Sequence, residues 1–227
     1  MKLKKILAVM MAGAMMLSMA ACGGEETTTA ESTGEQKTID GNVLDAEQYF
    51  NGYLNSEPTT LDSVTGNDSY SSSILTNSME PLTRLAEKDG ENVREGAAAE
   101  SWESNEDGTV WTFHLRDNKW SDGQPVTAND YVYAITRVLT PETGSPNSWL
   151  LTCVKNANAV LAGEMDPSEL GVKAIDDKTI EFTLESPTPY FLALTDTRVM
   201  MPQRQDIVEQ YGESYGAEAS NMVYNGP

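Results

Sequence analysis

The single histidine, His114, limits the catalytic chemistry available to this 227-residue chain. A nucleophile–histidine–acid arrangement needs its histidine at the mouth of a site, whereas His114 lies inside an alternating segment, on the face opposite the aromatic residues. No SxxK, HExxH or phosphate-binding glycine motif occurs. The carboxylate pair Asp176–Asp177 lies in a predicted turn, not in a cleft that could hold a glycosidase pair. We therefore expect a structural histidine and no enzymatic activity.

Metal and disulfide chemistry are equally restricted. Asn105–Gly108 could bind calcium weakly, but the ligand series is incomplete and a hairpin turn accounts better for these residues. Beyond Cys22 the chain contains one further cysteine, Cys153, so lipidation of Cys22 would leave no pair for an intramolecular disulfide, and zinc sites built on cysteines are excluded. We interpret Cys153 as a buried small hydrophobic residue and predict no cofactor.

The N-terminus has the three parts of a secretory signal over residues 1–21. Lysines precede the apolar stretch Ile6–Leu17, and the small-residue segment Ser18–Ala21 precedes Cys22 directly. This order resembles a bacterial lipoprotein signal, in which Cys22 would be lipidated; an ordinary secretory signal is the alternative. Residues 22–39 are predicted to be a flexible tether, because Gly23–Lys37 is almost free of apolar residues. A lipidated cysteine next to a tether would hold a folded domain close to a membrane.

The charge of the chain bears on its partners. The formal net charge is −20, and removal of a signal containing three lysines makes it more negative. Phosphates would be repelled by such a surface, so nucleic acid is excluded as a partner. The acidic residues are scattered among apolar ones, which indicates a solvated surface and not a functional acidic patch.

The clearest structural signals lie in residues 97–137. Val110–Arg116 alternates between apolar and polar residues, which predicts a half-buried strand. Turns are predicted at Glu106–Gly108 before it and at Ser121–Gly123 after it. Thr127 is the expected N-cap of a helix that ends before Pro141, with Asp130 as the acidic member of a capping box.

The other elements mix helices with hairpins, which predicts an α/β fold of the mixed α+β type. Segments rich in turn-forming residues predict surface loops over 60–70 and 142–149. The remaining predictions are a strand over 48–54, helices over 71–80, 150–162 and 190–194, hairpins over 85–93 and 172–184, and a last helix that starts at Pro202 and stops at Gly212.

The tryptophans allow two interpretations. Trp102, Trp111 and Trp120 recur every nine residues, and such a row is typical of a core between a sheet and its covering helix. A ladder that stacks on a ligand is the less favoured alternative. Trp149 differs, because it lies in a loop of serine, proline and asparagine, and we treat it as a candidate contact residue.

Several segments of the chain match the pattern of one protein family. They are EPTTLD at 57–62, AESWE at 99–103, DGTVWTFHLRDNKWSDGQPVTANDYVYA at 107–134, LGVKAIDDKTIEFTLESPTPYF at 170–191 and the terminal NGP at 225–227. With these segments the chain resembles the family 5 extracellular solute-binding proteins, which include the oligopeptide- and dipeptide-binding lipoproteins of ABC importers.

This resemblance implies a fold and an organisation. The fold would be multi-lobed, of the periplasmic-binding-protein type II class, with residues 40–80 and 200–227 in an incomplete main lobe and 81–199 in an additional lobe. Family members are about twice as long, so the chain is expected to be the N-terminal part of one. The implied protein is a non-catalytic, monomeric, extracytoplasmic lipoprotein that binds peptide by strand addition and docks on the permease subunits of an ABC transporter.

Few contact residues can be transferred from the family. Asn67, Asp68 and Ser69 match the segment that pairs with peptide backbone. A ligand-contacting tyrosine of the family is replaced here by Asn147, a departure that bears on peptide length and on the class of ligand. The alternatives are the same scaffold with another solute, such as a metal chelate or a sugar, and a lipid-anchored secreted hydrolase.

Overall fold

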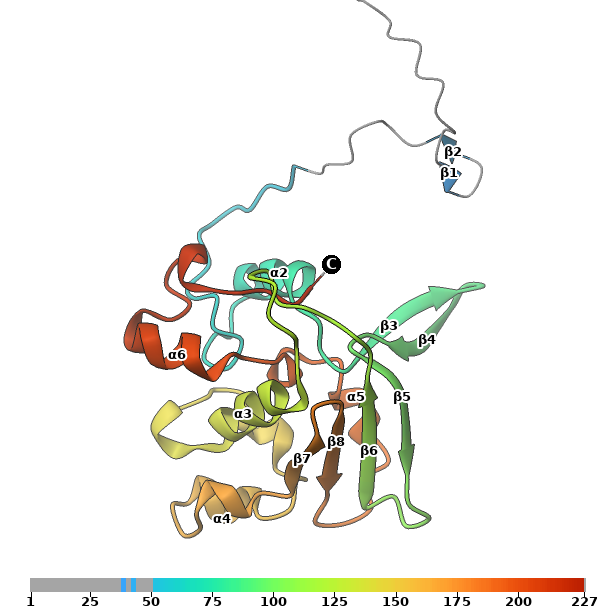
Figure 1. Ribbon diagram of the computed structural model, residues 1–227, viewed down its shortest axis with the longest axis vertical. Coiled ribbons are helices and arrows are strands. Elements are labelled where there is room, and N and C mark those ends of the chain that lie inside the picture. The colour runs from blue at the N-terminus through green and yellow to red at the C-terminus, as the bar shows by residue number, and fades with distance from the viewer. Residues whose placement is uncertain (1–37, 40–41, 44–50, 227) are drawn as a thin grey trace, which may run out of the picture. The chain divides into compact units, whose positions relative to one another are not determined.

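The computed structural model describes residues 38–39, 42–43 and 51–226, and the chain divides into two units, residues 1–52 and 53–227 (Figure 1). In the first unit, β1 (Thr38–Ile39) pairs antiparallel with β2 (Asn42–Val43). The predicted signal peptide, Cys22 and most of the predicted tether lie outside the described residues. The second unit contains all the other elements.

The main sheet of the second unit has four antiparallel strands. In spatial order they are β5 (Ala99–Ser104), β6 (Val110–Leu115), β8 (Thr179–Thr183) and β7 (Val172–Asp176). The central strand β6 confirms the predicted alternation, because Phe113 and Leu115 are buried while His114 between them is partly exposed. The predicted hairpin over 172–184 is also confirmed.

Helix α3 (Ala128–Leu139) packs on this sheet and begins where the sequence predicts. The Thr127 amide donates to Asp130 Oδ2 at 2.8 Å, and the Trp120 indole donates to the same oxygen at 3.2 Å. These bonds satisfy donors at the helix start. Burial raises the pKa of Asp130 against the effect of these hydrogen bonds. The apolar side of α3 is fully buried through Tyr131 and Ile135.

Aromatic rings fill the space between the sheet and the segments that cover it. The rings of Phe113 and Phe182 meet edge to face at 5.7 Å, and Phe191 lies 5.2 Å from Phe182. Trp111 packs on Phe191 at 5.7 Å. Such offset arrangements are favoured by the ring quadrupoles, so this cluster is the centre of the core.

The nine-residue spacing of tryptophans is only partly a core signal. Trp120 is 2% exposed, whereas Trp102 and Trp111 are half-buried at the margin of the core. Trp102 and Trp111 lie on the neighbouring strands β5 and β6, but Trp120 lies beyond the sheet, in the turn before α3. Equal spacing along the chain therefore did not place the three rings in one row.

Two tight turns follow from local sequence. At the β5–β6 turn, Asn105 Oδ1 accepts hydrogen bonds from the amides of Thr109 at 2.9 Å and Val110 at 3.1 Å, and Gly108 has a φ of 67°. This confirms the hairpin interpretation of Asn105–Gly108. The hairpin of β3 (Thr83–Lys88) and β4 (Glu91–Gly96) turns through Asp89 and Gly90, both with positive φ. It extends away from the rest of the unit (Figure 1).

Short helices complete the unit. They are α2 (Ser69–Ser78), α4 (Ala157–Leu161), α5 (Phe191–Leu194) and α6 (Gln205–Tyr211), with 3₁₀ turns η1 (Pro141–Thr143), η2 (Ser148–Leu151), η3 (Pro167–Glu169), η4 (Arg198–Met200), η5 (Gly212–Ser214) and η6 (Ala219–Asn221). None of the helices in the described ranges is long and apolar enough to cross a membrane.

Several sequence predictions were wrong in detail. The strand predicted over 48–54 is not formed at residues 51–54, and its earlier part lies outside the described ranges. The run 150–162 is not one helix but η2 followed by α4, because Asn156 between them adopts a left-handed φ of 66°. Pro202 is not helical, and α6 starts three residues later at Gln205.

A buried polar network ties α3 to the segment before α2. Arg137 on α3 donates to Asp62 Oδ2 at 3.1 Å, and Gln203 Nε2 donates to Asp62 Oδ1 at 2.7 Å. The side chains of Arg137 and Asp62 are only 19% and 5% exposed. The guanidinium also lies 5.7 Å from the centre of the Tyr215 ring. Charge and hydrogen-bonding capacity are thus matched inside the fold.

A second network holds the last described residues against the end of α2 (Ser69–Ser78) and the residues that follow it. Asn225 is fully buried; its amide donates to Glu80 O at 3.1 Å, and its Oδ1 accepts from Glu80 N at 2.9 Å. Next to it, Gly226 N donates to Ser78 O at 2.9 Å. A Cβ on Gly226 would lie 2.5 Å from the Ser78 carbonyl, so only glycine fits without a shift.

Candidate functional site

The loop predicted to contact ligand, Asn67–Ser69, forms the entrance to α2. Asn67 is exposed, whereas Asp68 is the N-cap and accepts from Ser71 N at 2.8 Å and Thr59 Oγ1 at 2.5 Å. The hydrogen bonds from Ser71, followed by the one from Thr59, hold the pKa of Asp68 well below its usual range. Ser69 is not in a loop as predicted, because it is the first residue of the helix.

The loop around Asn147 packs against this entrance. Ser145 Oγ donates to Val64 O at 2.7 Å, and Asn147 Nδ2 donates to Gly66 O at 3.3 Å. Ser145 is buried and Asn147 half-buried. Asn147 is therefore held beside the predicted Asn67–Ser69 loop, about eighty residues away in the chain, through Gly66, which directly precedes that loop.

Trp149 lies on η2, two residues beyond Asn147, and 64% of it is exposed. An apolar ring this exposed is accessible to another molecule, and its role as a contact residue stays a prediction. Among the described residues, no hydrogen bond joins Trp149 to the Asn67–Ser69 loop. Its backbone carbonyl accepts from Thr152 Oγ1 at 3.0 Å.

Arg198 also reaches the entrance to α2, although no sequence pattern predicted it there. Its Nη1 donates to Ser72 Oγ at 3.0 Å, and Ser72 Oγ donates to Asp68 O at 2.9 Å. Arg198 comes from η4, far along the chain, and a lone arginine in Thr-Arg-Val forms no motif. Only tertiary structure could place it at this loop.

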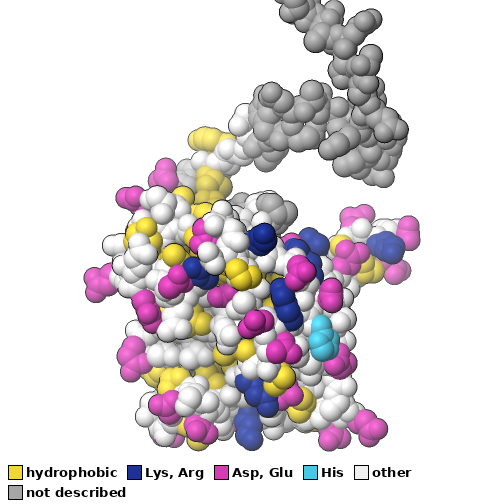
Figure 2. All heavy atoms as spheres, viewed as in Figure 1, with side chains coloured by type: hydrophobic (Ala, Val, Ile, Leu, Met, Phe, Trp, Pro, Cys, Tyr) yellow, Lys and Arg dark blue, Asp and Glu magenta, His cyan; other side chains and the backbone are white. Residues whose placement is uncertain are grey.

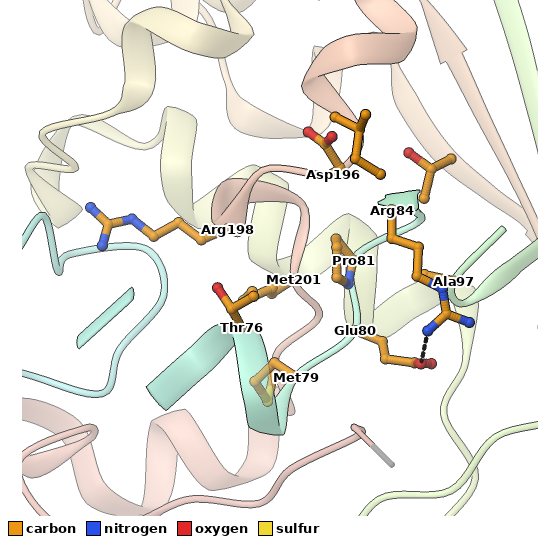
Figure 3. A pocket seen from close by; sticks show the side chains of 11 residues that line it. Thr76, Met79, Glu80, Pro81, Arg84, Ala97, Asp196, Arg198 and Met201 are labelled. Atoms are coloured by element: carbon orange, nitrogen blue, oxygen red, sulfur yellow. Dashed lines mark ion pairs between the residues drawn. The ribbon is translucent and has the colours of Figure 1, made fainter. Parts of the chain in front are cut away.

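A cavity of about 420 Å³ lies beside Arg198, between the end of α2, the start of β3 and η4 (Figure 3). Met79, Pro81 and Met201 give it an apolar lining, and Glu80 and Arg84 stand on its wall (Figure 3). Such a mixture of apolar lining with a few polar groups is typical of small-ligand sites.

The charges on this cavity are largely paired. Glu80 forms an ion pair with Arg116 and lies 3.7 Å from Arg84, and Asp196 pairs with Arg94 at 2.9 Å. In the surface view, Asp and Glu side chains spread over the visible face, while several Lys and Arg side chains gather near the base of the β3–β4 hairpin (Figure 2). The charged residues that line the cavity are two acidic ones, Glu80 and Asp196, and two basic ones, Arg84 and Arg198.

The residues considered for catalysis and metal binding lie elsewhere. His114 Nε2 is 3.1 Å from Glu103 Oε1 across β5 and β6, with both side chains substantially exposed. Within the described ranges no group of three His, Cys, Asp or Glu side chains could hold a metal ion. Cys153 is partly buried, not fully buried as predicted, and burial raises the pKa of its thiol.

The fold and these residues place the chain in a known class. The model of the bacterial extracellular solute-binding proteins, family 5 Middle, matches residues 94–227. The chain belongs to this family, as the sequence motifs predict.

Individual relatives differ in the ligand that their names record. The probable deoxycholate-binding periplasmic protein YgiS of Escherichia coli K12 is 38% identical over 186 residues, 81% of this chain and 34% of that protein. The periplasmic oligopeptide-binding protein OppA of Salmonella typhimurium LT2 is 45% identical over 131 residues, 56% of this chain and 24% of that protein.

A solved structure confirms the fold class. The substrate-binding domain of an oligopeptide ABC transporter from Bacillus anthracis str. Ames superimposes with a TM-score of 0.77 and 45% identity, over 81% of this chain and 35% of that one. The mixed α+β fold of periplasmic-binding-protein type is therefore shown. The chain spans about a third or less of the length of these relatives, a share that fits the incomplete main lobe predicted from the sequence.

Proposed function

We propose that this chain is part of a non-catalytic receptor that captures extracellular oligopeptides for an ABC importer. The main observation is the hydrogen bond from Asn147 to Gly66, because Gly66 directly precedes the Asn67–Ser69 loop and the bond holds Asn147 beside it. Relatives that are named oligopeptide-binding support the class of ligand. In this proposal Asn67 and Ser69 offer backbone and side-chain groups to an extended peptide, while Trp149 supplies an apolar contact.

Asp68 has a different role in this proposal. Its carboxylate is already occupied by Ser71 and Thr59, so it shapes the loop and does not bind ligand through its side chain. Asn147 likewise uses one amide N–H for Gly66. Its backbone carbonyl accepts from Leu150 N at 3.1 Å, so among the described residues the rest of its side-chain amide is what it can offer to a peptide backbone.

The cellular setting is part of the same proposal. Lipidation of Cys22 would anchor the protein outside the cytoplasmic membrane, and the tether over 22–39 would let the receptor reach the permease subunits. Residues 40–80 and 200–227 would form the main lobe and 81–199 the additional lobe of a monomer. The hydrogen bonds from the last described residues to Ser78 and Glu80 support this grouping of distant segments.

Calorimetry with peptides tests the function. The protein expressed from its complete gene should bind mixed tri- to pentapeptides, and saturating peptide should raise its melting temperature because ligand binds only the folded state. A metal chelate and a neutral sugar serve as controls for the other solutes that the scaffold could carry. Binding of either control without any peptide binding would refute a peptide receptor.

The name of one relative supports a second candidate function. A relative 38% identical to this chain is named for deoxycholate, a steroid carboxylate. The apolar lining at Met79 and Met201 beside Arg198 would suit such an amphiphile. Deoxycholate therefore belongs in the same titration, and its binding in place of peptides would favour this second function.

A further inference from the structure

Arg198 differs from every other arginine of the chain in its electrostatic surroundings. Each of the others lies within ion-pair distance of a carboxylate, whereas Arg198 has none among the residues that the structure describes. The pairs are Arg84–Glu80, Arg94–Asp196, Arg116–Glu80, Arg137–Asp62, Arg204–Asp122 and Arg204–Asp206.

The guanidinium of Arg198 is also poor in hydrogen bonds. It has five N–H donors, and within the described part of the chain only Nη1 is used, to Ser72 Oγ at 3.0 Å. The side chain is half-buried, and this burial lowers the pKa of Arg198. Moving a cation out of water costs free energy unless an anion or hydrogen-bond acceptor compensates for it. The guanidinium of Arg198 lacks such an anion among the described residues.

Asp68 is the nearest carboxylate on the adjoining loop, but it does not complete the site. It acts on Arg198 only through space, and its oxygens accept from the Ser71 amide, the Ser71 hydroxyl and the Thr59 hydroxyl. An N-cap carboxylate with three such bonds is committed to its helix. The unused donors of Arg198 therefore remain open to a group from outside the described chain.

The position of Arg198 connects the two parts of the candidate site. Its aliphatic part lines the cavity, while the side chain extends away from Met79, Pro81 and Met201 (Figure 3). Its guanidinium reaches the first turn of α2, next to the Asn67–Ser69 loop. A ligand on that loop could therefore place an anionic group on the guanidinium and apolar atoms in the cavity.

We infer that Arg198 is a specificity-determining residue that pairs with a carboxylate of the bound ligand, either an acidic side chain or the terminal carboxylate of a peptide. The inference rests on the proposed function and adds a preference of the receptor for peptides that carry a negatively charged group. Arginine suits this role because its fork of donors matches the two oxygens of a carboxylate. A preference for carboxylate-bearing ligands would not be expected from the net charge of the chain, because a chain with a formal charge of −20 repels anions as a whole.

The test compares peptides that differ only in charge. The protein from the complete gene is titrated calorimetrically with alanine tetrapeptides that carry Glu or Gln at each position in turn, and with tetra-alanine as free acid or C-terminal amide. We expect one carboxylate-bearing probe to bind about ten-fold more tightly than its neutral counterpart. The responding probe distinguishes a side-chain carboxylate from a terminal one, and the preference should weaken at high salt.

Variants assign the preference to Arg198. Arg198→Met should abolish it while neutral peptides still bind, and Arg198→Lys should restore part of it because the charge remains. Lys88→Met removes an equal charge from an exposed position on the nearby hairpin and should leave the preference unchanged. Unfolding curves establish that each variant is folded.

The failures of the two proposals are distinguishable. Tight binding of peptides with no preference for any carboxylate would overturn the role of Arg198 and leave the peptide receptor intact, and this result needs no variant. A preference that survives in Arg198→Met would also overturn it. Binding of no peptide at all would refute the proposed function and the inference with it.

Discussion

Arg137 and Arg198 show how the same side chain serves two purposes in one fold. Both are half-buried and both lie near the segment that leads into α2. Arg137 is held by Asp62, Gln203 and the Tyr215 ring, whereas Arg198 donates to Ser72 alone among the described side chains. Arg137 therefore stabilises the fold through several side-chain contacts, whereas Arg198 has one hydrogen bond among the described side chains.

The difference has a thermodynamic meaning. A buried ion pair contributes little compared with an apolar replacement of both partners, but removal of one partner leaves a costly unpaired charge. Arg137 and Asp62 are mutually dependent in this sense. Arg198 already bears a desolvation cost without a carboxylate partner among the described residues, so its loss should not harm the fold.

The largest expected effect comes from the Arg137 region. Asp62→Ala removes the carboxylate that accepts from Arg137 and Gln203, and we expect a loss of about 3–5 kcal/mol in the free energy of unfolding. Chemical denaturation followed by circular dichroism measures it. Arg84→Met is the matched control, since Arg84 is 54% exposed and its nearest carboxylate is 3.7 Å away. A loss below about 1 kcal/mol for Asp62→Ala would mean that the network is not structural.

The Arg198 region should respond much less. Arg198→Met removes a single hydrogen bond to Ser72 and relieves a desolvated cation, so the unfolding free energy should stay within about 0.5 kcal/mol of the unaltered protein. The same denaturation experiment measures this change. A loss comparable to that of Asp62→Ala would contradict the distinction between the two arginines, because it would give Arg198 a structural partner.

The pH dependence of stability at Asp68 shows whether this residue serves α2 or Arg198. Its folded pKa is lowered by hydrogen bonds from Ser71 and then Thr59, so its stabilisation is present above the ordinary aspartate pKa of about 3.9. That stabilisation is lost as pH falls through the lowered folded pKa. Asp68→Asn, which cannot titrate, should therefore be less stable above about pH 4 and approach the unaltered protein in stronger acid.

A double variant sharpens this experiment. If the hydrogen bonds of α2 dominate, Asp68→Asn should change the unfolding free energy equally in the unaltered protein and in the Arg198→Met background. Additive effects are expected for groups without a shared bond. Strong coupling between the two substitutions would show that Asp68 is the partner of Arg198, and the carboxylate preference would then lose its basis.

The sequence predicted the elements whose causes are local. The alternation in Val110–Arg116, the cap at Thr127 and the turn at Asp89–Gly90 all depend on neighbouring residues, and all were confirmed. Errors arose where distant parts of the chain decide. Pro202, suited to a helix start, is buried beside Gln203, whose side chain is held by Asp62 and Ser63.

The candidate site was less predictable for the same reason. Resemblance supplied Asn67–Ser69 and Asn147, and the structure showed that Asp68 is used by its own helix. Neither composition nor spacing indicated Arg198. It is notable because no carboxylate among the described residues forms an ion pair with it. Such an absence can be seen only after every other arginine has been paired in three dimensions.

The strand order of the main sheet has a consequence for how the chain folds. The β5–β6 and β7–β8 hairpins join neighbouring residues and can form within about 1–10 μs. The central pairing of β6 with β8 joins residues 110–114 to residues 179–183, so it must wait for the segment between them to order and for a long loop to close. We therefore expect the meeting of Phe113 with Phe182 to come late in folding, and substitutions there to slow refolding more than substitutions in either hairpin turn.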